Sequence, residues 1–246
     1  MPLHVTRQGR VAVLTLDDPE KRNALTPPLV ADLVTTMDEI DADSEVGAEV
    51  DTGAAPAFCS GADVGALKAM ADGTEEPADV RDIYSGFLRI LDSPLPTIAA
   101  VNGSAVGAGV NLALACNVRI AGTSAMFDAR FLRIGIHPGG GHTWLLDRAV
   151  GPQAAAAMNL FGVRVDGARA AEIGLAWECV ADDELVEHSI ALATRAAEVP
   201  RELSSRTKAT LRHTASLADH DPAMRFELEH QIWSFRQAFG PTASST

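Results

Sequence analysis

A glycine-rich turn between an apolar run and a helical pattern is the feature that most constrains the fold. The stretch "VGAGVNLALAC", Val106 to Cys116, opens with two glycines and continues into an alanine- and leucine-rich segment. A strand, a tight turn and a helix in this order are typical of α/β folds. The first polar side chain after the turn is Asn111, an amide that neither gains nor loses a proton at neutral pH.

Three kinds of site use such a turn. In a dinucleotide-binding G-x-G-x-x-G motif the third glycine would fall at Leu112, although Asp128 follows at roughly the 20-residue spacing of a ribose-binding acid. A phosphate-binding P-loop requires a Gly-Lys-Ser/Thr sequence, which does not follow here. The third possibility is an oxyanion hole, because unpaired N–H groups at a helix N-terminus stabilise negative charge on a carbonyl oxygen. An oxyanion hole needs a second donor, and "AFCSGADVGAL", residues 57–67, provides a second tight turn.

Composition excludes several classes of function. The chain has 246 residues and a net charge of −13, without a long basic run, which argues against nucleic-acid and anionic-membrane binding. Its three cysteines are far apart and lack metal-ligand spacing, so we expect a reducing compartment and no metal site. The N-terminal stretch does not resemble an export signal, and no apolar run is long enough to cross a membrane. These features together predict a cytoplasmic protein.

Strand and helix patterns alternate in the first two thirds of the chain. We predict strands at 11–18, 97–101 and 117–122, and a helix that begins at Pro27 with Thr26 as its cap. A polar stretch at 71–80 predicts a surface loop before a helix over 83–91.

Two regions fit these patterns less simply. A strand is also expected at 48–53, but Glu49 and Asp51 are unusual in a sheet that is buried on both faces. From about Gly151 the pattern is all helical, and its last segment carries Phe226, Trp233 and Phe239 on a face that should pack on the core or another subunit.

Five motifs spread over nearly the whole chain resemble the enoyl-CoA hydratase/isomerase (crotonase) superfamily. They are "PEKRNAL", "FCSGAD", "AAVNGSAVGAGVNLALACNVRIA", "FLRIGIHPGGGHT" and "GARAAEIGL". The resemblance implies an α/β fold, a crotonase-like spiral of ββα turns with a C-terminal α-helical trimerisation region. It implies a core with an acyl-CoA site over 1–195, a helical oligomerisation region over 196–246, and a homotrimer or homohexamer.

The resemblance also implies a ligand and its site. The N–H groups of Ala62 and Ala108 would form the oxyanion hole that polarises an acyl-CoA thioester. Coenzyme A would enter as part of the substrate, with no permanently bound cofactor. Residues implied for coenzyme A binding are Lys21, Arg22, Ala24, Ala62, Asp63, Val64, Gly65 and Lys68.

The chain departs from the family at both catalytic glutamates. Aligned on the motifs, these glutamates fall at Asn111 and Phe131, and neither residue is a general acid or base. His137 and Asp128 are the candidate substitutes, since an unperturbed imidazole titrates near neutral pH. Each also has a structural interpretation, His137 packing beside Pro138 and Asp128 capping a helix or pairing with Arg130 or Arg133.

Two functions follow from these departures. The first is an enzyme of acyl-CoA or fatty-acid metabolism, a hydratase-like lyase or isomerase or one with another enolate-based reaction. The second is a non-catalytic acyl-CoA-binding protein. Loss of both carboxylates makes ordinary hydration doubtful, whereas an intact pair of hole-forming turns fits either function.

Overall fold

Two β-sheets and the helices around them form the core of the molecule, and the computed structural model describes residues 2–74 and 84–240. The larger sheet contains, in spatial order, β1 (Leu3–Gln8), β2 (Val11–Leu16), β3 (Ala48–Gly53), β5 (Thr97–Val101), β7 (Val118–Gly122) and β10 (Glu178–Val180). The smaller sheet contains β4 (Ala57–Cys59), β6 (Ser104–Val106), β8 (Met126–Asp128) and β9 (Val165–Asp166). Neighbouring strands are parallel except in the pairs β1·β2 and β8·β9.

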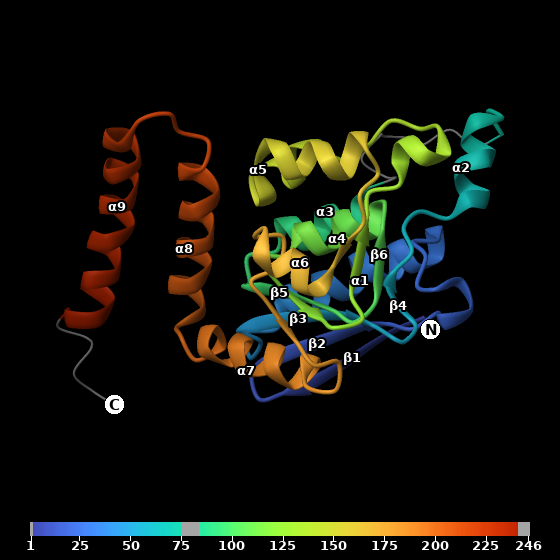
Figure 1. The fold of residues 1–246 in the computed structure, drawn as a ribbon. Coiled ribbons are helices and arrows are strands. Elements are labelled where there is room, and N and C mark those ends of the chain that lie inside the picture. Colours follow the sequence, from blue (N-terminus) through green and yellow to red (C-terminus); the bar gives the residue numbers. More distant parts are fainter. Residues whose placement is uncertain (1, 75–83, 241–246) are drawn as a thin grey trace.

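Helices cover both faces of the larger sheet. The helices of the described residues are η1 (Pro19–Lys21), α1 (Pro27–Ala42), α2 (Val64–Ala71), α3 (Ser85–Asp92), α4 (Ala108–Ala115), η2 (Phe131–Ile134), α5 (His142–Leu160), α6 (Gly167–Glu172), α7 (Leu185–Ala197), α8 (Arg201–Thr214) and α9 (His220–Phe239). One core cluster joins the sheet to α1, α3 and α4, and a second cluster joins its other face to α7. Figure 1 shows α7 on the opposite side of the sheet from α3 and α4.

Local sequence explains the element that leads into the site. The Thr26 hydroxyl accepts from the Leu29 N–H, and Pro27 occupies the first helical position, as predicted. Leu29, Leu33 and Met37 are fully buried along one face of α1. The predicted strands at 11–18, 97–101 and 117–122 are confirmed, with ends that differ by one or two residues.

Two sequence predictions for the remaining chain have different outcomes. The all-helical prediction after Gly151 is wrong, because β9 adds antiparallel to β8 and β10 adds parallel to β7. Strands of two and three residues are too short to produce an alternating pattern in the sequence. The predicted polar loop and the start of the helix that follows it lie largely outside the described residues, and the described part of that helix begins at Ser85.

The two carboxylates of β3 lie in the protein core. Glu49 is fully buried and Asp51 is 2% exposed, on a strand that is paired with β2 and β5. The Cys116 thiol donates to Asp51 Oδ2 over 3.2 Å. Burial raises the pKa of Asp51 from 3.8 to about 6, and burial followed by the charge of Asp51 raises the pKa of Glu49 well above its usual value. Folding therefore shifts both groups toward their protonated forms relative to the unfolded chain.

This burial predicts a pH-dependent gain in stability for Asp51→Asn. Because the pKa of Asp51 is higher in the folded state, stability is lost as pH rises from about 4 to about 6. The free energy of unfolding of Asp51→Asn should therefore rise relative to wild type by about 2 kcal/mol between pH 4 and pH 7. Urea unfolding at the two pH values measures this difference. For Asp147→Asn at an exposed position, the difference in unfolding free energy from wild type should be the same at both pH values. If the difference for Asp51→Asn is also the same at both pH values, the raised pKa of Asp51 is contradicted.

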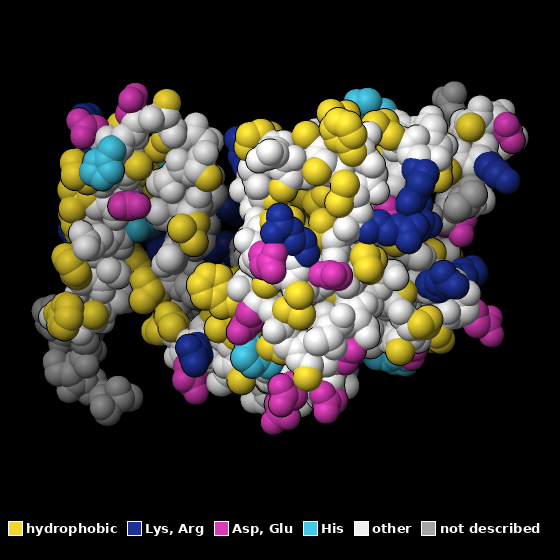
Figure 2. Space-filling view, in the orientation of Figure 1, with side chains coloured by type: hydrophobic (Ala, Val, Ile, Leu, Met, Phe, Trp, Pro, Cys, Tyr) yellow, Lys and Arg dark blue, Asp and Glu magenta, His cyan; other side chains and the backbone are white. Residues whose placement is uncertain are grey.

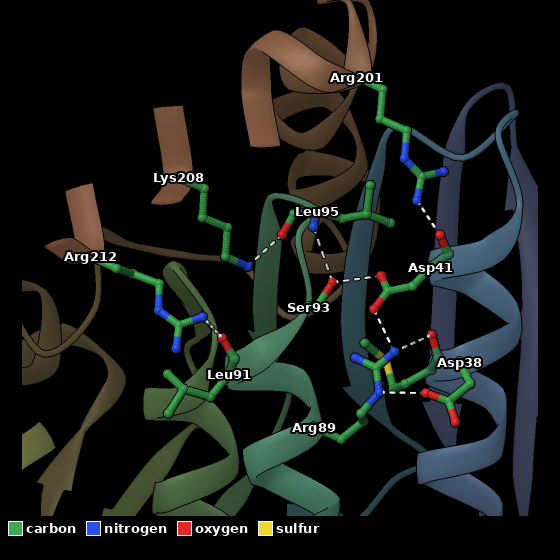
Figure 3. A network of polar contacts seen from close by, with 10 residues as sticks. Asp38, Asp41, Arg89, Leu91, Ser93, Leu95, Arg201, Lys208 and Arg212 are labelled. Carbon is green, nitrogen blue, oxygen red and sulfur yellow. Dashed lines mark hydrogen bonds and ion pairs between the residues drawn. The ribbon is translucent and has the colours of Figure 1, made fainter. Parts of the chain in front are cut away.

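The C-terminal helices attach to the core mainly through basic side chains. Lys208 is the one buried residue described on α8, and its ammonium donates to the Leu95 carbonyl (Figure 3). Arg201 donates to the carbonyls of Asp41, Asp43 and Val46. Burial lowers the pKa of Lys208 to about 8. Polar contacts to main-chain oxygens thus fix the position of α8.

The last helix has a large apolar surface. α9 packs against α8 and stands beside the core (Figure 1), and none of its residues is buried. Figure 2 shows hydrophobic side chains along these helices. The exposed apolar residues of α8 and α9 are Leu211, Met224, Leu228, Ile232, Phe235 and Phe239. In the part of the chain that the structure describes, no helix is long and apolar enough to cross a membrane.

Candidate active site

Two tight turns meet at the carboxyl ends of β4 and β6. The first runs from Gly61 to the start of α2, and the second, at Gly107, leads into α4. A Cβ atom on Gly61 would lie 2.4 Å from the Val106 carbonyl oxygen and 3.3 Å from the Ala108 nitrogen. A Cβ atom on Gly109 would lie 2.0 Å from the carbonyl oxygen of Cys59. Glycine at these positions therefore allows the two turns to approach each other.

The N–H groups of Ala62 and Ala108 are available for a ligand. Ala108 is the first residue of α4, so its N–H has no partner within the helix. Ala62 forms a β-bridge with Leu25, in which Leu25 N–H donates to the Gly61 carbonyl. Among the backbone hydrogen bonds of the described residues outside regular helices and strands, neither Ala62 nor Ala108 is a donor. The two N–H groups therefore lie on neighbouring turns and have no acceptor among these hydrogen bonds of the described residues.

A cavity of about 740 Å³ opens onto both turns. Its wall is mostly apolar, with Val30, Leu67, Met70, Ile134 and Ile136 among the lining residues. The side chains that bring polar atoms to this lining are Ser60, Asp63, Tyr84, Ser85, Asn111, Arg130 and His137. A cavity of this size and character is suited to a largely apolar small ligand with a few fixed polar contacts.

Asn111 is held in the cavity wall by two hydrogen bonds. Its Nδ2 donates to the Gly139 carbonyl over 3.1 Å, and its Oδ1 lies 2.6 Å from Nδ1 of His142. Because Oδ1 can only accept, His142 carries its proton on Nδ1. Burial lowers the pKa of His142 to about 4, so its imidazole is neutral at physiological pH. This neutral pair fixes the orientation of the amide.

Phe131 lines the cavity next to the glycine turn at Gly107. Its ring contacts His142 edge to face, with ring centroids 4.8 Å apart, and it also lines the cavity. A Cβ atom on Gly107 would lie 3.8 Å from the Phe131 ring. Phe131 therefore places an apolar ring beside Gly107, the residue before Ala108.

The structure separates the two candidate acid–base residues. His137 is exposed and lines the cavity, with Nδ1 2.7 Å from the Pro138 carbonyl. Since this carbonyl only accepts, neutral His137 carries its proton on Nδ1 and leaves the Nε2 lone pair free. Asp128 is buried and is not among the cavity-lining residues. Its Oδ2 is paired with three arginines, which include the two that its sequence context suggested.

The residues expected to contact coenzyme A lie around the first turn. Asp63 caps α2 by accepting from the Ala66 N–H, and Gly65 and the exposed Lys68 belong to the same helix as Val64. Ala24 is buried next to the bridge at Leu25. Lys21 and Arg22 are exposed at the end of η1, where Ser60 Oγ donates to the Lys21 carbonyl.

Three features of the site were not predicted from the sequence. Tyr84 lines the cavity, and a Cβ atom on Gly139 would lie 2.4 Å from its hydroxyl. His142 orients Asn111 through a hydrogen bond between positions 31 apart in the sequence. No group of three or more metal-ligating side chains occurs among the described residues. The pairing of Arg164 with Asp128 joins positions 36 apart in sequence, so sequence alone gave no signal for it.

Comparison with known proteins gives the family. A family model described as enoyl-CoA hydratase/isomerase matches residues 6–238. The chain belongs to the enoyl-CoA hydratase/isomerase family. It is 48% identical over 238 residues to the probable enoyl-CoA hydratase EchA14 of Mycobacterium tuberculosis H37Rv, covering 95% of this chain and 92% of the relative. It is 36% identical over 216 residues to the 2,3-dehydroadipyl-CoA hydratase of Escherichia coli K12, covering 88% and 84%.

Solved structures of this family confirm the predicted fold. A Thermobifida fusca YX protein determined in complex with CoA superimposes with a TM-score of 0.83 and 29% identity, over 96% of this chain and 93% of the other. The α/β core and the helical C-terminal region are both present. In this member of the enoyl-CoA hydratase/isomerase family, the two glycine turns, Asn111 and Phe131 line one cavity.

Proposed function

We propose that this protein binds acyl-CoA thioesters and forms the enolate of the bound acyl group. The observation that carries the proposal is the pair of unpaired N–H groups, Ala62 and Ala108, at the end of an apolar cavity. Two such donors stabilise a thioester oxygen more strongly as it becomes negative than in its neutral state. The T. fusca complex with CoA supports coenzyme A as the carrier of the acyl group.

His137 is the proposed base of this reaction. Its Nε2 would take a proton from the carbon next to the thioester carbonyl. The electron pair of the broken C–H bond then forms the carbon–carbon double bond of the enolate, and the negative charge on oxygen is stabilised by the two N–H groups. Return of the proton from His137 reverses the step. Asp128 is less suited to this role, because three arginines hold its carboxylate away from the cavity lining.

Hydration by a pair of glutamates is not part of this proposal. The amide of Asn111 is hydrogen-bonded to the Gly139 carbonyl and to His142, and the Phe131 ring packs on His142. General acid–base groups each contribute on the order of 10²- to 10⁴-fold to a reaction rate. Replacing both should therefore make addition of water to an enoyl thioester very slow.

A non-catalytic acyl-CoA-binding protein is the second candidate. The contacts of Asn111 with Gly139 and of Phe131 with His142 favour this candidate, because both side chains then stabilise the structure of the cavity wall and neither transfers a proton. For either function we propose a cytoplasmic homotrimer or homohexamer in which residues 196–246 mediate assembly. The exposed apolar residues of α8 and α9 support this assembly.

Exchange of α-protons tests the first candidate against the second. Butyryl-CoA in D2O, followed by NMR, should incorporate deuterium next to the thioester carbonyl when the protein is added. Calorimetric titration with butyryl-CoA tests binding separately. Binding without exchange would favour the non-catalytic protein, and absence of binding would contradict both candidates.

A further inference from the structure

Three arginine side chains converge on one buried carboxylate oxygen beside the cavity. Arg130, Arg133 and Arg164 place nitrogen atoms 3.1, 2.5 and 3.3 Å from Oδ2 of Asp128. Arg130 is the residue before η2, Arg133 lies within η2, and Arg164 is the residue before β9. We call Arg130, Arg133 and Arg164 the arginine cluster.

Among the described residues, Asp128 is the one carboxylate that pairs with the arginine cluster. Asp128 neutralises one of three guanidinium charges, and no other carboxylate of the described residues lies within 4.0 Å of the three groups. The side chain of Asp128 is 4% exposed, whereas those of the three arginines are 42%, 43% and 53% exposed. In a chain with a net charge of −13, this concentration of exposed positive charge is unusual. Figure 2 shows Lys and Arg side chains gathered near the elements that Figure 1 labels β6 and α2.

The cluster borders the proposed acyl-CoA site. Arg130 itself lines the cavity, between Ala129 and Phe131, which also line it. The Asp128 carbonyl accepts a hydrogen bond from the Gly107 N–H, so the cluster lies at the end of β8, next to the end of β6 where the second turn begins. Lys21, Arg22 and Lys68 stand around the first turn, so they are separate in the chain from the cluster.

We propose that the arginine cluster binds an oxyanion of the ligand that occupies the cavity. Guanidinium groups bind carboxylates and phosphates through paired N–H donors, and Asp128 holds all three groups in place before the ligand arrives. The oxyanion is either a carboxylate at the far end of the acyl group or a phosphate of coenzyme A. This inference rests on the proposed function, because it requires an acyl-CoA ligand in the cavity.

Saturated thioesters separate these two sources. Adipoyl-CoA and hexanoyl-CoA have acyl chains of six carbons, and only adipoyl-CoA carries a terminal carboxylate. Arg133→Gln and Arg164→Gln remove one guanidinium each and leave Asp128 with two partners. Arg169→Gln, which removes an exposed arginine paired with Glu172, is the matched control for net charge. Calorimetry gives the dissociation constant of each ligand, and thermal unfolding confirms that each variant is folded.

Each outcome has a defined meaning. If the cluster binds the acyl carboxylate, either cluster variant should weaken the binding of adipoyl-CoA about tenfold and leave the binding of hexanoyl-CoA unchanged. If the cluster binds a phosphate, either variant should weaken the binding of both thioesters about tenfold. If that phosphate is the 3′-phosphate, the substitutions should not change the binding of 3′-dephospho-hexanoyl-CoA. The control variant should change neither. Unchanged affinity for both thioesters would overturn the inference, while failure of wild type to bind hexanoyl-CoA would contradict the proposed function instead.

A measurement on wild type does not depend on folding of the variants. Binding through the cluster predicts that the affinity for the recognised ligand falls as salt rises from 50 to 500 mM. A steeper fall for adipoyl-CoA than for hexanoyl-CoA identifies the carboxylate. Equal slopes together with the same affinity for hexanoyl-CoA and its 3′-dephospho form argue against both a carboxylate and the 3′-phosphate.

Discussion

Ala108→Pro is expected to slow α-proton exchange in bound butyryl-CoA by about 10²- to 10³-fold, the usual effect of removing one oxyanion-hole donor. Proline lacks the N–H group but is accepted at the first position of a helix, where the N–H has no helical partner. Ala108 occupies this position in α4. The substitution therefore removes one donor without removing a hydrogen bond of the fold. Exchange is followed by NMR in D2O.

Ala108→Gly is the matched control for this variant. It retains the N–H and removes only the methyl group, so exchange should stay within a few-fold of wild type. Circular dichroism should show the same helical content for both variants. Equal exchange rates in the proline and glycine variants would mean that the Ala108 N–H does not stabilise the enolate.

His137→Ala is expected to lower exchange at least a hundredfold while butyryl-CoA still binds. The imidazole lines the cavity with its Nε2 free, and its other nitrogen faces the Pro138 carbonyl. Alanine removes the base but leaves the two N–H donors in place. Binding by calorimetry and exchange by NMR are measured on the same sample.

His4→Ala controls for loss of an imidazole elsewhere. His4 lies on β1, paired with Asp17, and does not line the cavity. This control should exchange at the wild-type rate. If His137→Ala exchanges as fast as wild type, another group is the base, and Asp128 becomes the next residue to replace.

The sequence predicted the parts of the site that depend on local backbone conformation. Gly107 and Ala108 were predicted as a turn and a helix start because glycine and the apolar run are neighbours in the chain. The second turn was found in the same way, through Gly61 and Ala62. What the sequence did not reveal is how closely the two turns approach, which depends on Gly109 packing against the Cys59 carbonyl.

Contacts between distant segments were beyond the sequence. The partners of Asn111 were not predicted, and His142 and Gly139 hold both ends of its amide. The environment of Glu49 and Asp51 depends on the order of strands in the sheet, which local patterns do not determine. In both cases the decisive partner comes from a segment brought near only by folding.

Hydration of crotonyl-CoA tests directly whether the protein retains the thioester site but lacks the hydration chemistry. Loss of the enoyl-thioester absorbance measures turnover, and calorimetry on the same preparation measures binding. We expect crotonyl-CoA to bind and its turnover to lie well below the typical enzymatic range of about 1 to 10³ s⁻¹. Turnover within that range by the wild-type protein would contradict the loss of hydration, because the protein would then hydrate the thioester with Asn111 and Phe131 in place of the two glutamates.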